Sequence, residues 1–211
     1  MKIKEPRLGY QLLTKEKARI IAHLIGDGWI GQSNHDYNMK YEVAEPELLD
    51  SFECDLVRVY GLPPTHGTNP SGKTGKLIPF VRLRSKIVYE DLMSYADYYS
   101  KNWKIKKQIF KASAEIKIEF LKALFDDEGS VIPQGKSAIV RLYSININGL
   151  KQIQFLLGEF SIESKIVPGF GLKRNVYALT IRDIGLFKSK IGFNLQRKKD
   201  LLNKPSLETR T

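Results

Sequence analysis

The amino-acid sequence predicts an α+β fold built of two similar halves, each with the element order αββαββα and an antiparallel sheet. Three observations support this prediction. The chain has 211 residues, which suits two units of about 100 residues each. Helical and strand periodicities of the apolar residues alternate along the chain in the same order twice. Short segments also return later in the chain at a nearly constant spacing, which indicates an internal duplication.

The repeat is carried by three pairs of segments that share their apolar pattern and their order. The pairs are residues 18–30 with 119–131, 43–62 with 143–162, and 79–92 with 176–189. The first pair aligns Asp27 with Glu128 and the second aligns Leu49 with Leu150, each 101 residues apart. The third aligns Phe80 with Tyr177, 97 residues later. Identity between the halves is low, so the duplication survives as a pattern rather than as a sequence.

The periodicity assigns the elements in chain order. In the first half we expect helices at 15–27, 46–60 and 86–99, and strands at 29–33, 38–44, 64–68 and 78–84. In the second half we expect helices at 114–127, 147–160 and 183–191, and strands at 129–133, 137–144, 163–167 and 175–182. A last helix is expected at about 195–203, and Pro46 suits the first turn of its helix. The predicted domains are a first half at 1–99, a linker at 100–112, a second half at 113–193, and a C-terminal helix and tail at 194–211.

Composition favours a polyanionic partner. The net charge is +11, from 34 Lys and Arg against 23 Asp and Glu, and the pI is about 9.6. Such an excess is typical of nucleic-acid binding, although a basic solvated surface on a protein with another task would also produce it. The single cysteine, Cys54, excludes an internal disulfide and a cysteine-based zinc site. No secretory leader or membrane span is visible at the sequence level, so we expect a cytoplasmic protein in a reducing compartment, with an organelle left open.

Basic side chains recur in the predicted strands and in the loops between them. The strands IPFVRLR (78–84) and AIVRLY (138–143) combine apolar residues with arginine, as in half-buried sheets whose open side can meet phosphate. The loop HGTNPSGKTGK (66–76) lacks the spacing of a phosphate-binding loop and reads as a flexible hairpin tip. The candidate DNA contacts are Arg82, Arg84, Lys86, Lys136, Arg141 and Arg182 near the strands, and Lys73, Lys76, Lys173 and Arg174 on loops.

Two helices are predicted to end on a carboxylate followed by glycine, in IIAHLIGDG (20–28) and LKALFDDEG (121–129). Small residues at Ala22, Gly26 and Ala123 would let the two helices pack closely, which places Asp27 beside Glu128. The glycines would then end the helices in the left-handed conformation. A carboxylate at a helix C-terminus costs about 0.3–1 kcal/mol, and a divalent cation such as Mg²⁺ would remove that cost. Ordinary helix-stop sequences are the alternative explanation for either site taken alone.

These two segments resemble the paired motifs of LAGLIDADG homing endonucleases of the single-chain, two-motif type. Asp27 and Glu128 occupy the eighth motif position, glycine follows each, and Ala22 and Ala123 stand at the small third position. The resemblance implies two pseudo-twofold halves whose sheets form a saddle over double-stranded DNA. It also implies a monomer that uses Mg²⁺, or another divalent cation such as Mn²⁺, to make a staggered double-strand cut. Asp27 and Glu128 would be the catalytic metal ligands, with backbone oxygens from Gly26 and Asp127.

The sequence also departs from the motif at several positions. His23 replaces an apolar residue and is expected at the seam between the helices, while Asp126 and Asp127 leave the identity of the second ligand open by one position. The ends of the second strands carry Ala44 with Glu45 and Ser144 with Ile145, where the family often has glutamine or lysine. A regulator or an RNA-splicing maturase that has lost cleavage is therefore the second hypothesis. A basic structural or protein-interaction domain is the third.

Overall fold

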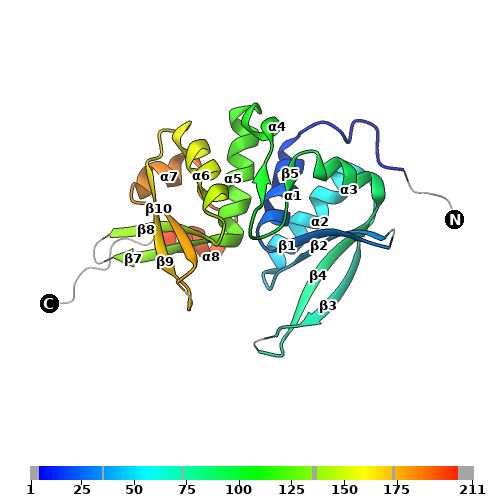
Figure 1. Cartoon of the computed structure of the whole chain (residues 1–211), viewed down its shortest axis with the longest axis horizontal. Helices are drawn as coiled ribbons and strands as arrows, with labels where there is room; N and C mark the ends of the chain where they lie inside the picture. The colour runs from blue at the N-terminus through cyan, green and yellow to red at the C-terminus, as the bar shows by residue number, and fades with distance from the viewer. Residues whose placement is uncertain (1–4, 35, 73, 135–136, 173, 204–211) are drawn as a thin grey trace.

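The computed structural model describes residues 5–34, 36–72, 74–134, 137–172 and 174–203. It confirms the predicted α+β class: two four-stranded antiparallel sheets lie in two similar halves, with a central pair of helices between them (Figure 1). Three of the basic candidates, Lys73, Lys136 and Lys173, lie outside the described residues. None of the helices described here combines the length and the apolar character needed to cross a membrane.

The first half runs from α1 to β5. Its helices are α1 (Lys15–Ile25), α2 (Pro46–Tyr60) and α3 (Lys86–Met93), and its strands are β1 (Gly28–Ser33), β2 (Asp36–Glu42), β3 (Thr65–Pro70), β4 (Leu77–Arg84) and β5 (Ala96–Asp97). Local sequence sets the helix starts. Thr14 and Ser85 accept hydrogen bonds from the backbone N–H groups of Lys17 and Val88, and Pro46 opens α2. Gly61 ends α2 in the left-handed conformation, with φ of 68°.

The second half repeats this order. Between the halves lie β6 (Lys104–Ile105) and α4 (Lys107–Phe110), followed by α5 (Ala114–Glu128), β7 (Gly129–Gln134), β8 (Ser137–Ser144), α6 (Ile147–Gly158), β9 (Ser164–Phe170), β10 (Val176–Ile181) and α7 (Ile184–Lys190). The last helix is α8 (Gln196–Asn203). Asn146 and Asp183 cap α6 and α7 by accepting hydrogen bonds from Gly149 and Leu186.

Strand register confirms the duplication and corrects one detail of it. The sheets have the orders β1-β2-β4-β3 and β7-β8-β10-β9, which correspond strand for strand. Gly28 pairs with Tyr41, and Gly129 pairs with Leu142, so the offset of 101 holds for these strands. Val81 pairs with Tyr41 and Leu179 with Leu142, which makes the offset of the later strands 98. The predicted alignment of Phe80 with Tyr177 was therefore wrong by one residue, and a shift of one residue exchanges the two faces of a strand.

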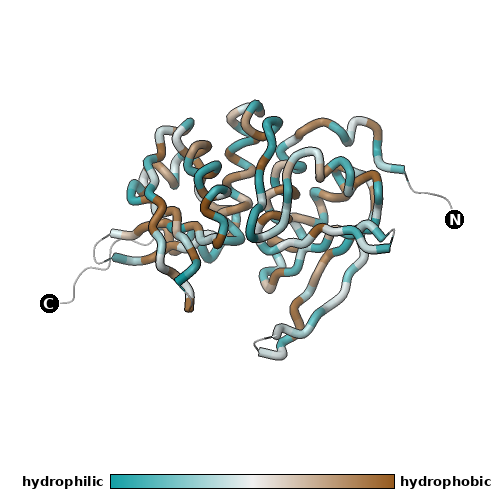
Figure 2. The backbone as a smooth tube through the Cα atoms, in the orientation of Figure 1, coloured by the Kyte–Doolittle hydropathy of each residue, from teal (hydrophilic) through white to brown (hydrophobic). Residues whose placement is uncertain are grey.

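The central helices α1 and α5 pack against each other and join the two halves. These helices bury apolar residues that include Ile21, Ala22 and Ala123. Figure 2 shows hydrophobic stretches along these helices and inside each half, whereas hydrophilic residues dominate the outer loops. Arg19, in the N-terminal half of α1, also links the two halves. Its guanidinium binds Asp55 of the first half and Glu119 of the second half at 2.7 Å each. Small residues at the seam thus bring the helices close, as the sequence predicted.

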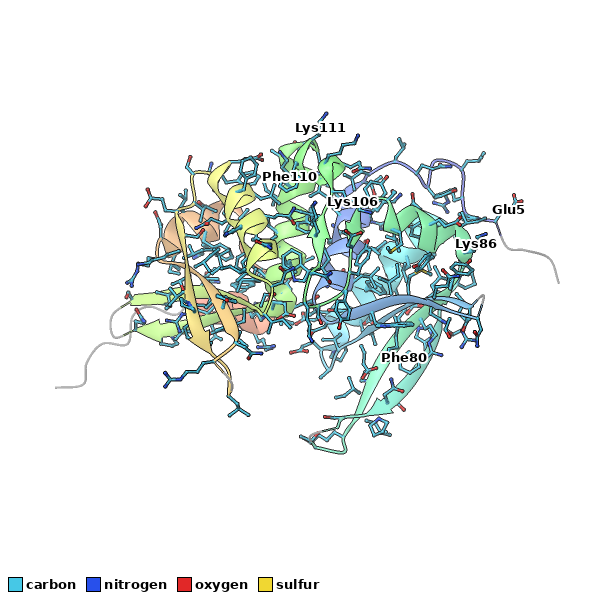
Figure 3. The ribbon with its side chains drawn as sticks, viewed as in Figure 1. Glu5, Phe80, Lys86, Lys106, Phe110 and Lys111 are labelled. Atoms are coloured by element: carbon cyan, nitrogen blue, oxygen red, sulfur yellow. The ribbon has the colours of Figure 1, made fainter. Side chains whose placement is uncertain are left out.

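The stretch around residues 94–112 differs from the predicted long helix followed by a plain link. Helix α3 ends at Met93, and β5 then pairs with β6. Trp103 is buried against Gly149, and its carbonyl oxygen accepts a hydrogen bond of 2.6 Å from Asn146. The segment is therefore packed onto α6 by tertiary contacts that periodicity does not encode. Figure 3 shows Lys106, Phe110 and Lys111 of this segment on the side of the molecule away from the β3–β4 hairpin.

Candidate active site

The two acidic motifs end their helices by a mechanism other than the predicted one. Neither Gly28 nor Gly129 has a positive φ, so the expected left-handed caps were wrong. Both glycines instead begin a strand that turns back directly along its own helix. A Cβ atom at Gly28 would lie 2.6 Å from the Cα of Leu24, and one at Gly129 would collide with the carbonyl oxygen of Phe125. Glycine is required here for close backbone approach rather than for an unusual dihedral.

Gly26 and Asp127 occupy equivalent positions of the duplication and fit each other across the seam. A Cβ atom at Gly26 would lie only 2.6 Å from the Oδ2 atom of Asp127. Because Gly26 of the first motif has no side chain, there is room for the Asp127 carboxylate of the second motif. The pair breaks the symmetry of the helix contact, since one small residue accommodates one larger polar residue.

The Asp127 carboxylate is fully buried and hydrogen-bonded by the first half. The Tyr41 hydroxyl donates to Oδ1 at 2.6 Å, and Nδ1 of His23 lies 3.1 Å from both carboxylate oxygens. Burial of the His23 ring opposes its charged form, but the Asp127 carboxylate overrides this effect and raises the pKa of His23. Burial, followed by the same carboxylate, raises the pKa of Tyr41. His23 is thus at the helix seam, as expected, where it is a partner of Asp127.

The three consecutive acids at the end of α5 have different surroundings. Asp126 is 2% exposed, and its carboxylate accepts hydrogen bonds from the backbone N–H groups of Asn194 and Leu195 at 2.9–3.0 Å. Asp127 is bound to His23 and Tyr41. Glu128 is half-buried, and Asp27 is among the charges that perturb it. Glu128 is thus the acid of this run whose pKa Asp27 raises, and we call Asp27 and Glu128 the acid pair.

Both members of the acid pair have pKa values raised above those of free carboxyl groups. Burial, then Asp27 and Asp127, raises the pKa of Glu128 to about 7. The protein surroundings of its carboxyl group, then Asp127, raise the pKa of Asp27 to about 6, although the residue as a whole is exposed. Lys198 acts in the opposite direction on both groups. The pair is therefore a site of unbalanced negative charge at neutral pH, which a cation would stabilise.

A stability measurement checks this electrostatic description. The folded protein binds a proton at Asp27 and at Glu128 more tightly than the unfolded chain does. Protonation of the two carboxyl groups therefore stabilises the fold fully below about pH 4, and this stabilisation is lost as pH rises through 6–7. In EDTA, Asp27→Asn/Glu128→Gln should melt about 2–4 °C above the wild type at pH 8, or roughly 1 kcal/mol, most of it from the less exposed Glu128. The gap should close by pH 4. Equal melting temperatures at both pH values would contradict the raised pKa values.

The acid pair fits a divalent cation held partly by solvent. Within the described ranges, no three His, Cys, Asp or Glu side chains converge as ligands. Mg²⁺ commonly takes one or two carboxylates and keeps several waters, so a two-carboxylate site satisfies its chemistry. The carbonyl oxygen of Asp127, an expected backbone ligand, lies 3.4 Å from the Lys198 ammonium, which already donates to it. The cation would therefore rest mainly on Asp27 and Glu128.

The open face of the first sheet carries the basic residues predicted for it. Lys40 pairs with Arg82, and Asn38 pairs with Arg84, across β2 and β4. Arg82 lies 4.7 Å above the Phe80 ring, and Lys40 lies 5.5 Å from it. These residues surround a shallow depression whose lining is Trp29, Asn38, Lys40, Arg82 and Arg84. We call this group the first basic face.

The equivalent face of the second sheet carries Arg141. Arg141 pairs with Ser130 and Thr180, and its guanidinium lies 4.9 Å from the Phe170 ring. In the described part of the chain, its Nε atom and the Thr180 hydroxyl are buried without a hydrogen-bond partner. A buried donor left unpaired on a basic surface is suited to an anionic ligand.

The remaining basic candidates are dispersed. Lys76 and Arg174 are exposed at the tips of the β3–β4 and β9–β10 hairpins, and Arg182 is exposed just after β10. Lys86 begins α3 and lies 5.8 Å from the Tyr37 ring. In Figure 3, Lys86 lies beside α3 on one side of the first sheet, and Phe80 lies on the other. The fold thus separates Lys86 from the first basic face.

Sequence reasoning missed Trp29, Lys40 and Lys198. The first two had a signal, because in DYNMKYE the buried Met39 and Tyr41 alternate with Asn38 and Lys40, which fixes the outward face. Trp29 is 51% exposed and its ring lies over Gly31, where a Cβ would touch it. Lys198 had no local signal, since it reaches the site from the last helix.

Comparisons with known proteins agree with this geometry. Residues 115–192 match the model of the LAGLIDADG-like domain. The structure is similar to I-DmoI in complex with DNA and Mn, with a TM-score of 0.61, 16% identity, and coverage of 85% of this chain and 97% of that chain. I-WcaI bound to its DNA recognition sequence has a TM-score of 0.57 and 17% identity, with coverage of 88% of this chain and 92% of that chain. The N-terminal LAGLIDADG domain of WhiA has a TM-score of 0.56 and 13% identity, with coverage of 98% of this chain and 91% of that chain.

The molecule therefore has the fold of LAGLIDADG homing endonucleases in both halves, and the resemblance inferred from its motifs is confirmed. Its second half, from Glu115 to Gly192, is also similar in sequence to the LAGLIDADG-like domain. A curated relative is the DNA polymerase II large subunit of Thermococcus kodakarensis, 25% identical over 149 residues. The match spans 70% of this chain but only 8% of that subunit.

Proposed function

We propose that the protein is a site-specific double-strand DNA endonuclease that requires Mg²⁺ or another divalent cation such as Mn²⁺. The observation that carries this proposal is the acid pair of Asp27 and Glu128 at the joint between two basic sheets. The similar endonuclease structures include complexes with DNA together with Mn or Ca, which supports the same ligands here. The limited share of the polymerase subunit that matches is consistent with a module carried inside a longer polypeptide.

In the proposed mechanism, the basic faces bind the DNA backbone and hold the duplex against the central helices. Arg82 and Arg84 supply forked donors for phosphate or for the major-groove edge of guanine. Asp27 and Glu128 would hold the cation, which would supply Lewis acidity at the scissile phosphate when bound. Tyr41 and His23 keep the Asp127 carboxylate turned away from the phosphodiester, so that only the acid pair faces it.

Cleavage of a plasmid library tests the proposal. A supercoiled library with randomised inserts would be incubated with the protein in Mg²⁺ and, in parallel, in EDTA. We expect a subset of inserts to be linearised only with Mg²⁺, and sequencing of the ends should give a common site with short 3′ overhangs. Protein that selects an insert by binding, yet neither nicks nor linearises it, would exclude the nuclease.

Salt dependence of duplex binding tests the DNA surface separately. Each phosphate contact contributes about one unit to the slope of log K against log salt concentration. Arg82→Ala and Arg141→Ala should each lower that slope by about 1, measured by fluorescence anisotropy on a labelled duplex. Lys86→Ala is the matched control, because Lys86 lies on the helix side of the first sheet. An equal loss from Lys86→Ala would place the DNA elsewhere.

The second candidate function is DNA-binding regulation, or RNA binding as a maturase, on the same scaffold without cleavage. The fold likeness to the N-terminal LAGLIDADG domain of WhiA over 98% of this chain favours keeping this candidate. The same library experiment separates the two functions, since a regulator would enrich one insert without cutting it. Competition by unlabelled RNA against that insert would identify a maturase. A monomer is expected in either case, and sedimentation at micromolar concentration would test this.

A further inference from the structure

Helix α8 lies outside the duplicated unit, yet it reaches the acid pair. Figure 1 places it beside the end of α5 from which β7 begins. Lys198 of α8 is 3% exposed, and its ammonium donates to the carbonyl oxygens of Phe125 at 3.0 Å, of Asp126 and, more weakly, of Asp127. These carbonyls belong to the last turn of α5, where partners within the helix run out, although that of Phe125 also accepts the backbone N–H of Gly129. The residue that follows them is Glu128.

The contact between α8 and α5 is reciprocal. The Asp126 carboxylate accepts the backbone N–H groups of Asn194 and Leu195 at the start of α8, while Lys198 closes the end of α5. The anionic Asp126 thus lies at the N-terminal end of α8 and the cationic Lys198 at the C-terminal end of α5, which are the charges that these two helix ends favour. Burial lowers the pKa of Lys198, and Asp126 counters this effect.

Helix α8 is also tied to the first half. Arg197 forms an ion pair of 2.5 Å with Glu45, which directly precedes α2, and the backbone N–H of Gln196 donates to Glu47 at 3.2 Å. Glu45 is one of the charges that act on Asp27. The helix therefore connects the end of α5, where Glu128 lies, with the part of the first half that lies near Asp27.

We propose that Lys198 is a positioning residue of the acid pair: by closing the end of α5 within the α8 contact, it holds Glu128 toward Asp27 for a divalent cation. This inference rests on the metal site of the proposed function but does not require cleavage. A purely electrostatic role predicts the opposite result, since removing a positive charge near two metal ligands would tighten cation binding.

Binding of Mn²⁺ to the full chain in the absence of DNA tests this proposal. The chain has two tryptophans, and Trp103 lines a small cavity together with Glu128. In a Trp29→Phe background, quenching of Trp103 emission by MnCl₂ would report binding at the acid pair. We expect Lys198→Met to raise the Kd for Mn²⁺ about 10-fold, the usual size for loss of a supporting partner. Lys198→Arg should restore it to within about threefold, because the charge and donors remain.

Lys199→Met is the matched control, because Lys199 points about 100° away around the same helix. Unchanged or tighter Mn²⁺ binding by Lys198→Met would overturn the proposal, as would equal weakening by Lys199→Met or a wild type that shows no quenching. If Lys198→Met does not fold, Arg197→Met tests the exposed tie to Glu45. It should weaken Mn²⁺ binding about twofold to threefold, and no change would overturn the proposal. A wild type that binds Mn²⁺ but cuts no library member would contradict the nuclease and not the positioning role.

Discussion

Replacing Asp27 with Asn and Glu128 with Gln together is expected to abolish DNA cleavage while tightening duplex binding. Loss of a catalytic cation removes several kcal/mol of transition-state stabilisation, and about 4 kcal/mol corresponds to roughly a 10³-fold lower rate. At pH 8 the same change removes two negative charges that would face the phosphodiester backbone in the proposed complex, so we expect the duplex Kd to fall a few-fold at low salt. Both quantities can be measured on the insert selected from the library.

Glu115→Gln is the control for this variant. Glu115 lies in the first turn of α5, at the opposite end of the helix from Glu128, and it is exposed. It should change neither the cleavage rate nor the duplex affinity beyond the general effect of one surface charge. Cleavage retained by the double variant would show that other groups hold the cation. Cleavage lost together with binding would show that the acids support the fold of the interface instead.

Replacing Asp127 with Ala is expected to destabilise the protein by about 2–4 kcal/mol. The change leaves the buried Tyr41 hydroxyl and the His23 ring without their shared acceptor, and unpaired buried polar groups carry a cost of this order. Chemical denaturation with urea would measure the loss. A change below about 0.5 kcal/mol would mean that water replaces the carboxylate.

A double-mutant cycle with Gly26→Ala isolates the fit between the two motifs. In the wild type, a methyl group at Gly26 would press on the Asp127 carboxylate and should cost about 1–3 kcal/mol. In the Asp127→Ala background the space is free, so the same change should cost much less, with a coupling of about 1–2 kcal/mol. Gly158→Ala is the control, because a Cβ at Gly158 meets no atom within 4 Å. Additive effects at Gly26 and Asp127 would refute the proposed packing.

The predicted fold was accurate where periodicity is local and strong. Every strand of the two four-stranded sheets, and every helix of the two halves except the one expected at 86–99, lies close to its predicted range. The acid of each motif follows the expected seam of small residues. The long helix expected at 86–99 was the main error, because pairing of β5 with β6 depends on a segment that returns from further along the chain. Burial of Trp103 against Gly149 depends on such a contact as well.

The sequence by itself determined the α+β class, the duplication, the net charge of +11 and the two carboxylates placed against their own helix dipoles. Only the tertiary structure decided that Asp126 caps α8, that Asp127 binds His23 and Tyr41, and that Glu128 is the acid of this run whose pKa Asp27 raises. It also decided that Lys198 closes α5. Repeats and helical periodicity are local properties of the chain. The partner of each polar side chain is fixed by helix packing and strand register between distant segments, where a shift of one position changes every contact.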